Sequence, residues 1–556
     1  MALAGIPNCF SCSAILFTGS LVFAGLGVVS HLLYFIHGEL NKQAGNIVVF
    51  FITTYTVLLG LCMFPCGATS QAWLVATVFF ATYQIALGSS IAVYRLLLHR
   101  SSCFPGPKQA ALTKWYGAFV ARKTQRYHAE LRRLHQTYGD IVRTGPRELS
   151  INRVDAIKEI YGNNSKCLKG PWYDMGGTGF NLHRTRNPIL HAKQRPLWEQ
   201  GFREMSGHIS KIEIKITSLL RFLRSAPSNA DVVTIFELFS FKLMAFIIFS
   251  QDIDGEPALD TDVSKSHEQL RQSQRAIGTF GHVPWYYSVS SKFKFLIPEN
   301  DGFTRLATRM IDQRRTINPD VPDLFSYLLP SEKNGEGAGF PMSWEARLAM
   351  VAGSGNVSSA LISLVFYLAA NPNALKQLQD EVDPLLNSGN FNPKLRHPVL
   401  SSIMFETFRL QPLVPNGGER VSPPQGFAIG DTFIPGDCVI KVPTYTLFRD
   451  ERYFARPDEW VPERWSTQPN LVKNPSAFIP FSIGPYSCVG RPLGTVEISL
   501  VLAHLVHNFD LQLSEGQNPQ DFDSLGQDHF GMTFPPGSLR IDFKSRKRNK
   551  DELSRI

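Results

Sequence analysis

The fold of this chain is decided by ten residues near its C-terminus, Phe481-Ser482-Ile483-Gly484-Pro485-Tyr486-Ser487-Cys488-Val489-Gly490. Glycines stand four residues before and two residues after Cys488, where backbone has to turn at positive φ or approach a flat ring closely. Amide N–H groups aimed at a thiolate lower its basicity and tune a bound metal. The pattern therefore suits a cysteine that ligates haem iron, although a buried structural thiol in a Gly-rich loop would leave the same pattern.

Composition predicts one large folded domain with an appended region. The chain has 556 residues, of which 44% are hydrophobic and 19% charged, so it is long and apolar enough for a large core. Its formal net charge of +9 is modest, with basic residues concentrated near 95–133 and 544–550. We expect no nucleic-acid partner, because zinc-type spacing, a recognition helix and aromatic-basic interleaving are all missing from the sequence. Anionic lipid or an acidic protein partner explains the charge better.

The first hundred residues have the character of membrane sequence. Apolar runs at about 13–37, 46–66 and 72–98 each reach the roughly 20 residues that cross a bilayer. Basic residues follow the third run, so the positive-inside rule predicts a lumenal N-terminus and a cytosolic domain. Because His31 and His37 sit late in the first run, two spans remain an alternative to three. We predict an anchor at 1–103, a catalytic domain at 104–540 and a basic tail at 541–556.

The remainder of the chain shows long amphipathic helical patterns with a few short strands. Within it, Glu406 and Arg409 are three residues apart on one predicted helix face. Taken alone, such an E-x-x-R is a common solvated surface pair. Its place before a proline-rich aromatic segment, with Arg464 following and Cys488 some eighty residues downstream, favours a structural role in a larger site.

These three motifs in this order resemble the cytochrome P450s, from about residue 104 to the C-terminus. The resemblance implies a mainly α fold with small β-sheets, preceded by N-terminal transmembrane helices. It makes Cys488 the axial iron ligand of haem b (iron protoporphyrin IX), with Glu406, Arg409 and Arg464 locking the core beside it. The haem contacts that it implies are His191, Arg195, Arg420, Phe481, Gly484, Tyr486 and Gly490. Two segments, Gly25–Leu40 and Gly170–Asp174, are similar to a fungal multi-span branch of the family.

The resemblance also implies an activity and its partners. We expect NADPH- and O2-dependent hydroxylation, or a related tailoring step, on a lipophilic small molecule of fungal secondary metabolism. NADPH would act through a separate flavoprotein reductase. The expected location is the endoplasmic reticulum membrane, multi-pass, with the catalytic domain in the cytosol. Pocket walls are expected near 176–180, 239–249, 350–354, 413–418 and 530–534.

Two positions depart from the family pattern. Most members carry arginine or histidine two residues before the cysteine, whereas this chain has Tyr486, a neutral donor. Over the haem, Gly355 and Asn356 replace the usual acid and threonine that deliver protons. Asn356 could position a water but is no practical proton source, and Ser359 on the same face could offer a hydroxyl. With Gly353 and Gly355 two residues apart, we expect local opening of this helix.

Three functional hypotheses follow. The first is a monooxygenase in which protons pass through a water held by Asn356, a serine or the substrate itself. The second is a haem-thiolate enzyme of atypical reaction: oxidative rearrangement, cyclisation, dehydration or peroxide-driven chemistry. The third is a catalytically silent membrane protein that binds lipophilic ligands or a partner.

Overall fold

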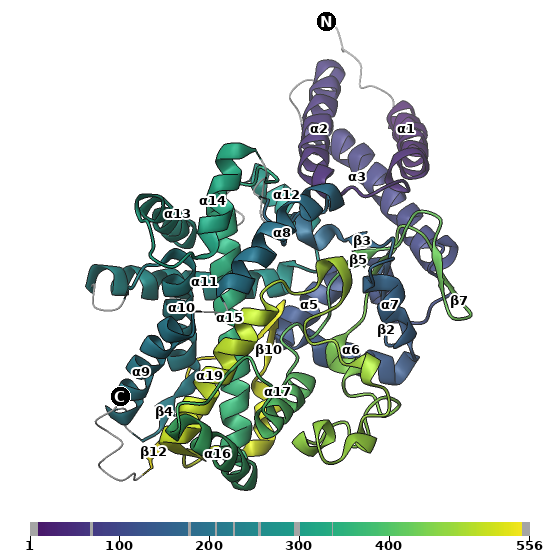
Figure 1. Cartoon of the computed structure of the whole chain (residues 1–556). Helices are drawn as coiled ribbons and strands as arrows, with labels where there is room; N and C mark the ends of the chain where they lie inside the picture. Colours follow the sequence, from purple (N-terminus) through teal and green to yellow (C-terminus); the bar gives the residue numbers. More distant parts are fainter. Residues whose placement is uncertain are drawn as a thin grey trace, which may run out of the picture.

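A computed structural model describes residues 9–66, 70–175, 180–205, 208–225, 228–253, 257–293, 301–335 and 337–546. Residues 176–179 of the expected pocket wall, and the predicted basic tail beyond residue 546, lie outside the described residues. Figure 1 shows a broad helical body from which three helices project, with β2, β3, β5 and β7 on one side of the body and β4 and β12 at the opposite lower side.

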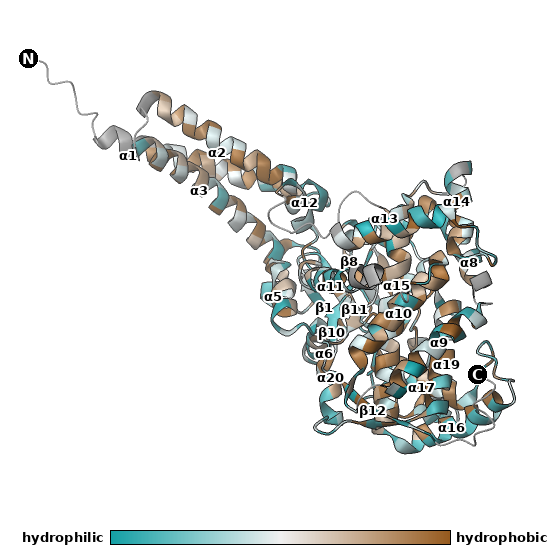
Figure 2. Cartoon of the chain, turned by 90° about the vertical axis from the view of Figure 1, so that its left-hand side faces the viewer, coloured by the Kyte–Doolittle hydropathy of each residue, from teal (hydrophilic) through white to brown (hydrophobic). Residues whose placement is uncertain are grey.

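The projecting helices are α1 (Cys9–Ser30), α2 (Ala44–Cys66) and α3 (Ser70–Val93), and Figure 2 shows them as a largely hydrophobic bundle. The segments Leu16–Phe35, Asn41–Phe64 and Ser70–Leu98 are each long and apolar enough to span a membrane, and only 11%, 6% and 11% of each is buried. α1 lies against α3 closely enough that a Cβ on Gly27 would come within 2.5 Å of the Tyr83 carbonyl oxygen, as in small-residue packing of membrane helices. The length of all three helices favours three spans over two.

The loop between α1 and α2 lies against the body rather than in open solvent. Glu39 accepts from the Arg186 guanidinium at 2.8 Å and Lys42 pairs with Asp174 at 3.0 Å. The backbone N–H of Gly45 donates to the Ser288 hydroxyl at 3.2 Å. The loop and the body therefore lie at the same end of the bundle, and α1 and α2 extend away from the body (Figure 1).

The body is mainly helical, as expected. Asn187 caps one of its long helices, accepting from the N–H groups of Ile189 and Leu190 at 2.9 and 3.2 Å, with Pro188 as the first helical residue. The helices are α4 (Lys108–Leu112), α5 (Trp115–Thr124), α6 (Tyr127–Tyr138), α7 (Asp155–Tyr161), α8 (Pro188–Met205), α9 (Ile209–Ser225), α10 (Val232–Phe249), α11 (Pro257–Phe280), α12 (Trp285–Lys292), α13 (Asp301–Thr316), α14 (Leu324–Asn334), α15 (Met342–Ala370), α16 (Pro372–Asn387), α17 (Pro398–Leu410), α18 (Thr444–Leu447), α19 (Arg491–Asn508) and α20 (Phe522–Leu525).

The strands are short and form small sheets. The largest sheet has the order β1-β2-β8-β5-β3, in which β2 and β8 are parallel and the other neighbours antiparallel. The others are β4-β12-β9, β6-β7 and β10-β11. The strands are β1 (Ile141–Gly145), β2 (Glu148–Ile151), β3 (Leu168–Lys169), β4 (Ala230–Asp231), β5 (Arg420–Val421), β6 (Phe427–Ile429), β7 (Thr432–Ile434), β8 (Val439–Lys441), β9 (Phe509–Leu513), β10 (Gln527–His529), β11 (Gly531–Thr533) and β12 (Arg540–Ser545).

α15 runs through the core and packs along α10. Both are apolar enough to span a membrane, but 61% of α10 and 67% of α15 is buried within the body, so they are core helices. α15 is a continuous α-helix through Gly353 and Gly355, and the expected local opening was wrong. A Cβ on Gly353 would lie 2.3 Å from the Met244 methyl carbon, so this glycine permits close helix packing.

Candidate functional site

The cysteine loop lies between a short 3-10 turn, Gly484–Tyr486, and the start of α19. Cys488 N–H donates to the Phe481 carbonyl at 2.9 Å, which closes the loop. Gly484 has φ +72°, and a Cβ there would lie 2.0 Å from the Tyr161 carbonyl oxygen, so the position requires glycine. Gly490 has φ −82° and a Cβ there would lie 3.9 Å from Phe202 and 4.0 Å from the Cys488 sulfur, so among the described residues nothing at this position requires glycine.

The Cys488 thiol is held at the N-terminus of α19. Its side chain has accessible surface although protein atoms crowd most of its surroundings. This crowding raises the pKa of the Cys488 thiol, while N–H groups of Gly490 and Arg491 hydrogen-bond to the sulfur and oppose the rise. An accessible sulfur that accepts two amide donors fits a thiolate ligand for haem iron.

Basic side chains surround Tyr486. Lys169 Nζ and Arg420 Cζ each lie 4.8 Å from the centroid of its ring, and the His191 ring meets it edge-on with centroids 4.7 Å apart. Lys169 and Arg420 are each 3% exposed and His191 5%. Two strands and α8 thus converge on one residue of the cysteine loop.

The cluster carries an excess of positive charge. Burial lowers the pKa of His191 to about 3, and the charges of Lys169, Arg195 and Arg420 add to the effect. Burial, Arg420 and Arg195 likewise hold the pKa of Lys169 well below its usual range. Arg420 Nε is buried with no hydrogen-bond partner among the described residues. Because such a cluster favours an anion, these residues fit the two carboxylates of haem b.

Arg195 braces the cysteine loop itself. Its guanidinium donates to the carbonyl oxygens of Pro485 at 2.9 Å and Ser487 at 2.8 Å. It also pairs with Glu199 one turn along α8 at 2.7 Å. Of the expected haem contacts, Arg195 is therefore the one that holds the loop through direct hydrogen bonds.

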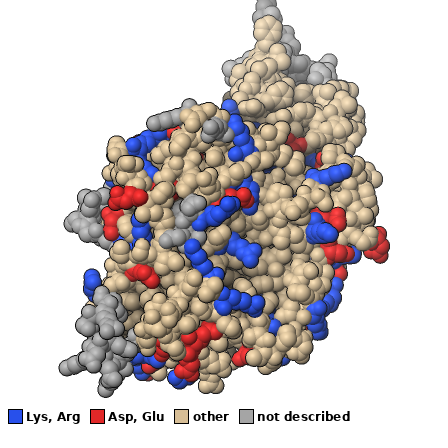
Figure 3. Space-filling view, viewed as in Figure 1, with Lys and Arg blue, Asp and Glu red and all other residues tan. Residues whose placement is uncertain are grey.

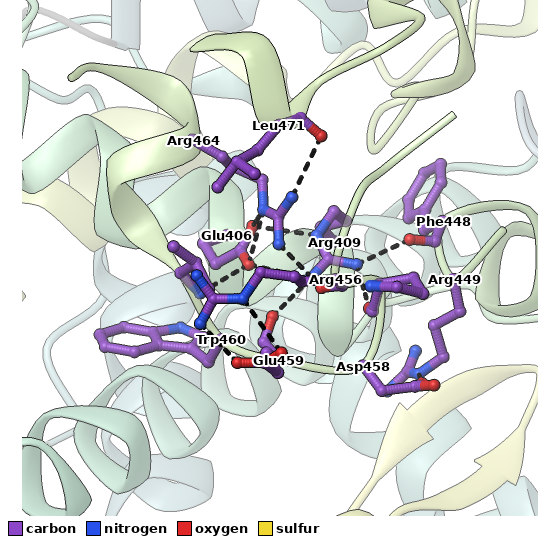
Figure 4. A network of polar contacts seen from close by, with 12 residues as sticks. Glu406, Arg409, Phe448, Arg449, Arg456, Asp458, Glu459, Trp460, Arg464 and Leu471 are labelled. Atoms are coloured by element: carbon purple, nitrogen blue, oxygen red, sulfur yellow. Dashed lines mark hydrogen bonds and ion pairs between the residues drawn. The ribbon is translucent and has the colours of Figure 1, made fainter. Parts of the chain in front are cut away.

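Glu406 and its arginines form a buried network (Figure 4). Glu406, Arg409 and Arg464 all have fully buried side chains. Arg409 makes two bonds to Glu406 at 2.8 and 2.9 Å, and Arg464 Nε donates to the same carboxylate at 2.9 Å. The remaining arginine donors reach carbonyl oxygens such as those of Phe448 and Leu471, at 2.7 and 3.3 Å. The alternative of a solvated surface pair was wrong: the network ties α17 to the loops that precede the cysteine.

Asn356 and Ser359 lie on the face of α15 next to the β10–β11 hairpin. Asn356 donates to the Ala352 carbonyl at 3.2 Å, and its amide oxygen would lie 3.4 Å from a Cβ on Gly531. Ser359 donates its hydroxyl proton to the Met532 carbonyl at 2.6 Å. Ser359 is therefore engaged in tying the hairpin to α15, while Asn356 keeps an amide oxygen toward the hairpin.

Aromatic side chains cover this region. The Trp172 ring stacks on Phe530 with centroids 3.9 Å apart, and His183 meets Phe530 edge-on at 5.7 Å. Phe530 has φ +77°, an unusual conformation for a bulky residue and one that clusters at functional sites.

Tyr173 joins the basic cluster around Tyr486 to the aromatic side chains beside α15. Tyr173 accepts from Arg420 at 3.4 Å and meets the Trp172 ring edge-on with centroids 5.2 Å apart. The basic cluster around Tyr486 thus leads directly to the aromatic cover of α15. Sequence reasoning missed Lys169 and Trp172 as site residues, although Trp172 stands in the Gly170–Asp174 motif and Lys169 directly precedes it.

The expected pocket walls are only partly placed at this site. Residues 530–534 lie beside α15 at Asn356 and Ser359, and the Met532 N–H donates to the Leu413 carbonyl of the 413–418 segment at 2.9 Å. The pocket-wall role of the α15 segment 350–354 stays a prediction. The segment 239–249 lies within α10, whose side chains are largely buried in the main core. Its role as a pocket wall stays a prediction, because an apolar helix has the same sequence pattern whether it lines a pocket or fills a core.

Known proteins match the chain over nearly its whole length. A family model described as Cytochrome P450 matches residues 105–541. Cytochrome P450 monooxygenase FCK2 of Fusarium pseudograminearum (strain CS3096) is 33% identical over 545 residues, which cover 94% of this chain and 97% of that protein. Cytochrome P450 monooxygenase phqL of Penicillium fellutanum is 31% identical over 94% of each chain. Tryprostatin B 6-hydroxylase of Aspergillus fumigatus is 31% identical over 92% of this chain and 94% of its own.

Proposed function

Because this chain belongs to the cytochrome P450 family of haem monooxygenases, we propose that it hydroxylates a lipophilic small molecule of fungal secondary metabolism with O2 and with electrons from NADPH. The observation that carries the proposal is Cys488, an accessible thiol that accepts two amide donors beside an uncompensated basic cluster. Bound haem would supply the activation of O2 and the oxidation of a C–H bond.

The residues of this chain would bind and orient that group. Cys488 would ligate the iron, with the Gly490 and Arg491 amides fixing the direction of the sulfur. His191 and Arg420 would bind the haem carboxylates, while Arg195 holds the loop in place. Phe481 supports the loop through the Phe408 ring, 6.1 Å away between centroids.

The aromatic cover supports a lipophilic substrate. Trp172 and Phe530 present flat apolar surface beside α15, which favours a substrate with a planar apolar portion. One of the relatives is named as a hydroxylase of tryprostatin B. The proposal extends to this chain only the class of reaction, hydroxylation of a lipophilic fungal metabolite.

Asn356 is proposed to hold the water through which protons reach the site. Its amide oxygen faces the hairpin, and Ser359 already donates to Met532. Gly355 carries no side chain that could relay a proton. The absence of an acidic side chain at positions 355 and 356 also favours a second candidate, an atypical haem-thiolate reaction such as rearrangement, cyclisation or peroxide-driven oxidation, of which the peroxide-driven kind takes its protons from the peroxide itself.

Electron supply is proposed to come from a separate NADPH-dependent flavoprotein reductase. Figure 3 shows Lys and Arg side chains gathered near the middle of the face where Figure 1 places α8 and the start of α19. Lys193 and Arg203 on α8 and Arg491 on α19 are exposed. A basic surface beside the cysteine loop suits an acidic partner.

We propose that the protein is bound to a membrane, because α1, α2 and α3 are long and apolar enough to span one. They would anchor the protein in the endoplasmic reticulum membrane as a multi-pass anchor, with residues 104–540 as the cytosolic catalytic domain. The docked loop supports this topology, because Glu39 and Lys42 contact the domain and so must lie on its side of the bilayer.

The proposal is tested by the reduced, carbon-monoxide-bound absorption spectrum of membranes that contain wild type or Cys488→Ser. We expect a red-shifted thiolate-type Soret band in the wild type and its loss in the variant, because serine supplies no thiolate. Cys438→Ser is a matched control, since Cys438 is a buried thiol of the β5–β8 region. Wild-type protein that binds haem without that band would overturn the ligand assignment.

A further inference from the structure

A small cavity lies where the anchor meets the body. Its volume is about 60 Å³, which is room for a few waters or for one small polar group. Its walls come from the segment after α1, from the end of α3 with the turn that follows it, and from the turn between β1 and β2. The lining residues are His31, Phe35, Ile36, Ile91, Tyr94, Arg95, His99, Pro146 and Arg147. The cavity therefore forms only when the anchor lies against the body.

Arginines crowd this cavity, and none of its described lining residues carries a carboxylate. Burial lowers the pKa of His99 to about 4, and the charges of four arginines add to the effect: Arg143, Arg147, Arg100 and Arg95. Arg143 is 3% exposed, and its Nε has no hydrogen-bond partner among the described residues. The Asp437 carboxylate reaches Arg100 at 4.0 Å, but it is 44% exposed and offsets little charge. Such a cluster favours a bound anion.

Apolar residues at the ends of the spanning segments line the same cavity. Phe35 ends the segment Leu16–Phe35, and Ile91 lies near the end of Ser70–Leu98, both of which are long and apolar enough to cross a bilayer. The cavity thus lies at the depth where acyl chains give way to headgroups in the leaflet that faces the body. A ligand suited to it has an anionic group beside an apolar portion.

We propose that this cavity binds the phosphate group of one anionic phospholipid from that leaflet, with Arg95 and Arg147 as the phosphate ligands. Basic pockets beside spanning helices on the cytoplasmic side bind such headgroups, and the planar guanidinium matches the geometry of a phosphate. The bound lipid offsets the repulsion among the arginines and joins α3 to the β1–β2 turn. The inference goes beyond the proposed monooxygenase function, because it rests on the membrane anchor and not on haem.

The competing role for the two arginines is to tie the polypeptide together. Arg95 donates to the Leu112 carbonyl at 2.6 Å. Arg147 donates to the Asp437 carbonyl at 2.9 Å and also to the Gly38 carbonyl. Carbonyl oxygens accept these bonds without neutralising the charges, and each guanidinium has five N–H donors. The two roles differ in one respect, because only the first requires a bound lipid.

The test counts the phospholipids bound to the full-length protein by native mass spectrometry, after release from nanodiscs of phosphatidylcholine with or without a minor share of phosphatidic acid. We expect one phosphatidic acid per wild-type chain and at least about tenfold less in Arg95→Gln/Arg147→Gln, the effect of losing one bond to a charged group. Arg95→Lys/Arg147→Lys keeps the charge and should keep most of the lipid. The matched control is Arg122→Gln/Lys123→Gln, which removes the same charge from exposed neighbours on α5.

A second measurement needs no variant and so holds even if the glutamine protein does not fold. A photoactivatable phosphatidic acid should label wild-type residues 91–99 or 146–147, and excess inorganic phosphate should not release the bound lipid.

Each outcome decides the inference. Selective binding that the glutamine variant loses, and that the lysine variant and the α5 control keep, supports it. Equal retention of phosphatidylcholine, label at other residues, or an equal loss in the α5 control overturns it. Release by inorganic phosphate assigns the cavity to the free anion, and equal losses in the glutamine and lysine variants assign the arginines the structural role. Failure of the proposed haem function is distinguishable, because it appears in the carbon-monoxide spectrum and leaves lipid binding unchanged.

Discussion

At the scale of single residues, Asn356 is the test of how protons reach the site. Its side chain bonds only to its own helix among the contacts described, at the Ala352 carbonyl, which leaves its amide oxygen available to a water. Asn356→Ala should therefore raise severalfold the fraction of NADPH electrons that leaves as hydrogen peroxide rather than water or product. Peroxide release and O2 uptake per NADPH, measured with a flavoprotein reductase added, check this expectation.

A matched control lies directly after the same helix. Asn371 follows α15 and makes the same kind of bond to the carbonyl four residues earlier, at Tyr367, 2.7 Å away. Asn371→Ala should leave the peroxide fraction unchanged. Equal behaviour of the two variants would remove Asn356 from proton delivery, and turnover without NADPH would favour the atypical reaction instead.

Residue chemistry that depends on local motifs was predictable, and chemistry that depends on strand pairing was not. Gly484 stands in a loop whose spacing predicts a positive φ, and the structure gives Gly484 that conformation, while ligation of iron by Cys488 stays a prediction that the family resemblance supports. Lys169 belongs to a strand of two residues, too short to leave a period-2 pattern. Only its register with Arg420 brings it to Tyr486.

At the scale of elements, the Glu406 network fixes α17 against the segment that leads to the cysteine loop. Glu406→Gln would leave Arg409 and Arg464 buried with their charges uncompensated, at a cost of about 3–5 kcal/mol. We expect a large drop in the temperature at which the haem absorption band is lost on heating. The measurement is a thermal melt followed at that band.

The control for this prediction is Glu459→Gln in the neighbouring loop. Glu459 pairs with Arg456, but their side chains are 56% and 49% exposed, so we expect a cost of less than about 1 kcal/mol. Similar melting temperatures for the two variants would contradict a structural role for the buried network.

Prediction from sequence failed for elements in which the role of a residue depends on what packs against it. Taken alone, the E-x-x-R motif predicts a pair on the surface. It is buried because other elements pack around it. The sequence predicts that Gly353 weakens α15. In the structure its missing side chain lets Met244 of α10 pack closely against α15. In both cases the deciding partner lies far away in the sequence.

At the scale of the whole molecule, the anchor and the body form one docked unit. The α1–α2 loop reaches the segment before α8 through Arg186 and Asp174, and it reaches α12 through Ser288. The segment before α8 also carries Trp172 of the aromatic cover. The anchor loop thus holds together two parts of the body that are more than a hundred residues apart in the sequence.

This docking predicts the behaviour of Glu39→Lys. Burial raises the pKa of Glu39, but hydrogen bonds and the charge of Arg186 outweigh burial and hold it below its usual value. The pair is therefore fully formed above that usual value and is lost as pH falls through the lowered one. Lysine at 39 would repel Arg186 at every pH, so hydrogen exchange in residues 180–187 and in α12 should be severalfold faster in membranes at neutral pH.

The pH dependence of hydrogen exchange distinguishes loss of the Glu39–Arg186 contact from a general loosening of the body. Wild-type exchange in these segments, corrected for its intrinsic dependence on pH, should stay slow above the usual pKa of a glutamate and rise as pH falls through the lowered pKa of Glu39, whereas the Glu39→Lys protein should show no such step. Glu268→Lys is the matched control, since Glu268 pairs with Arg271 on α11 at 3.9 Å away from the anchor. If Glu39→Lys and Glu268→Lys give the same exchange in α12, the loop does not hold the body, and the topology would rest on the positive-inside rule alone.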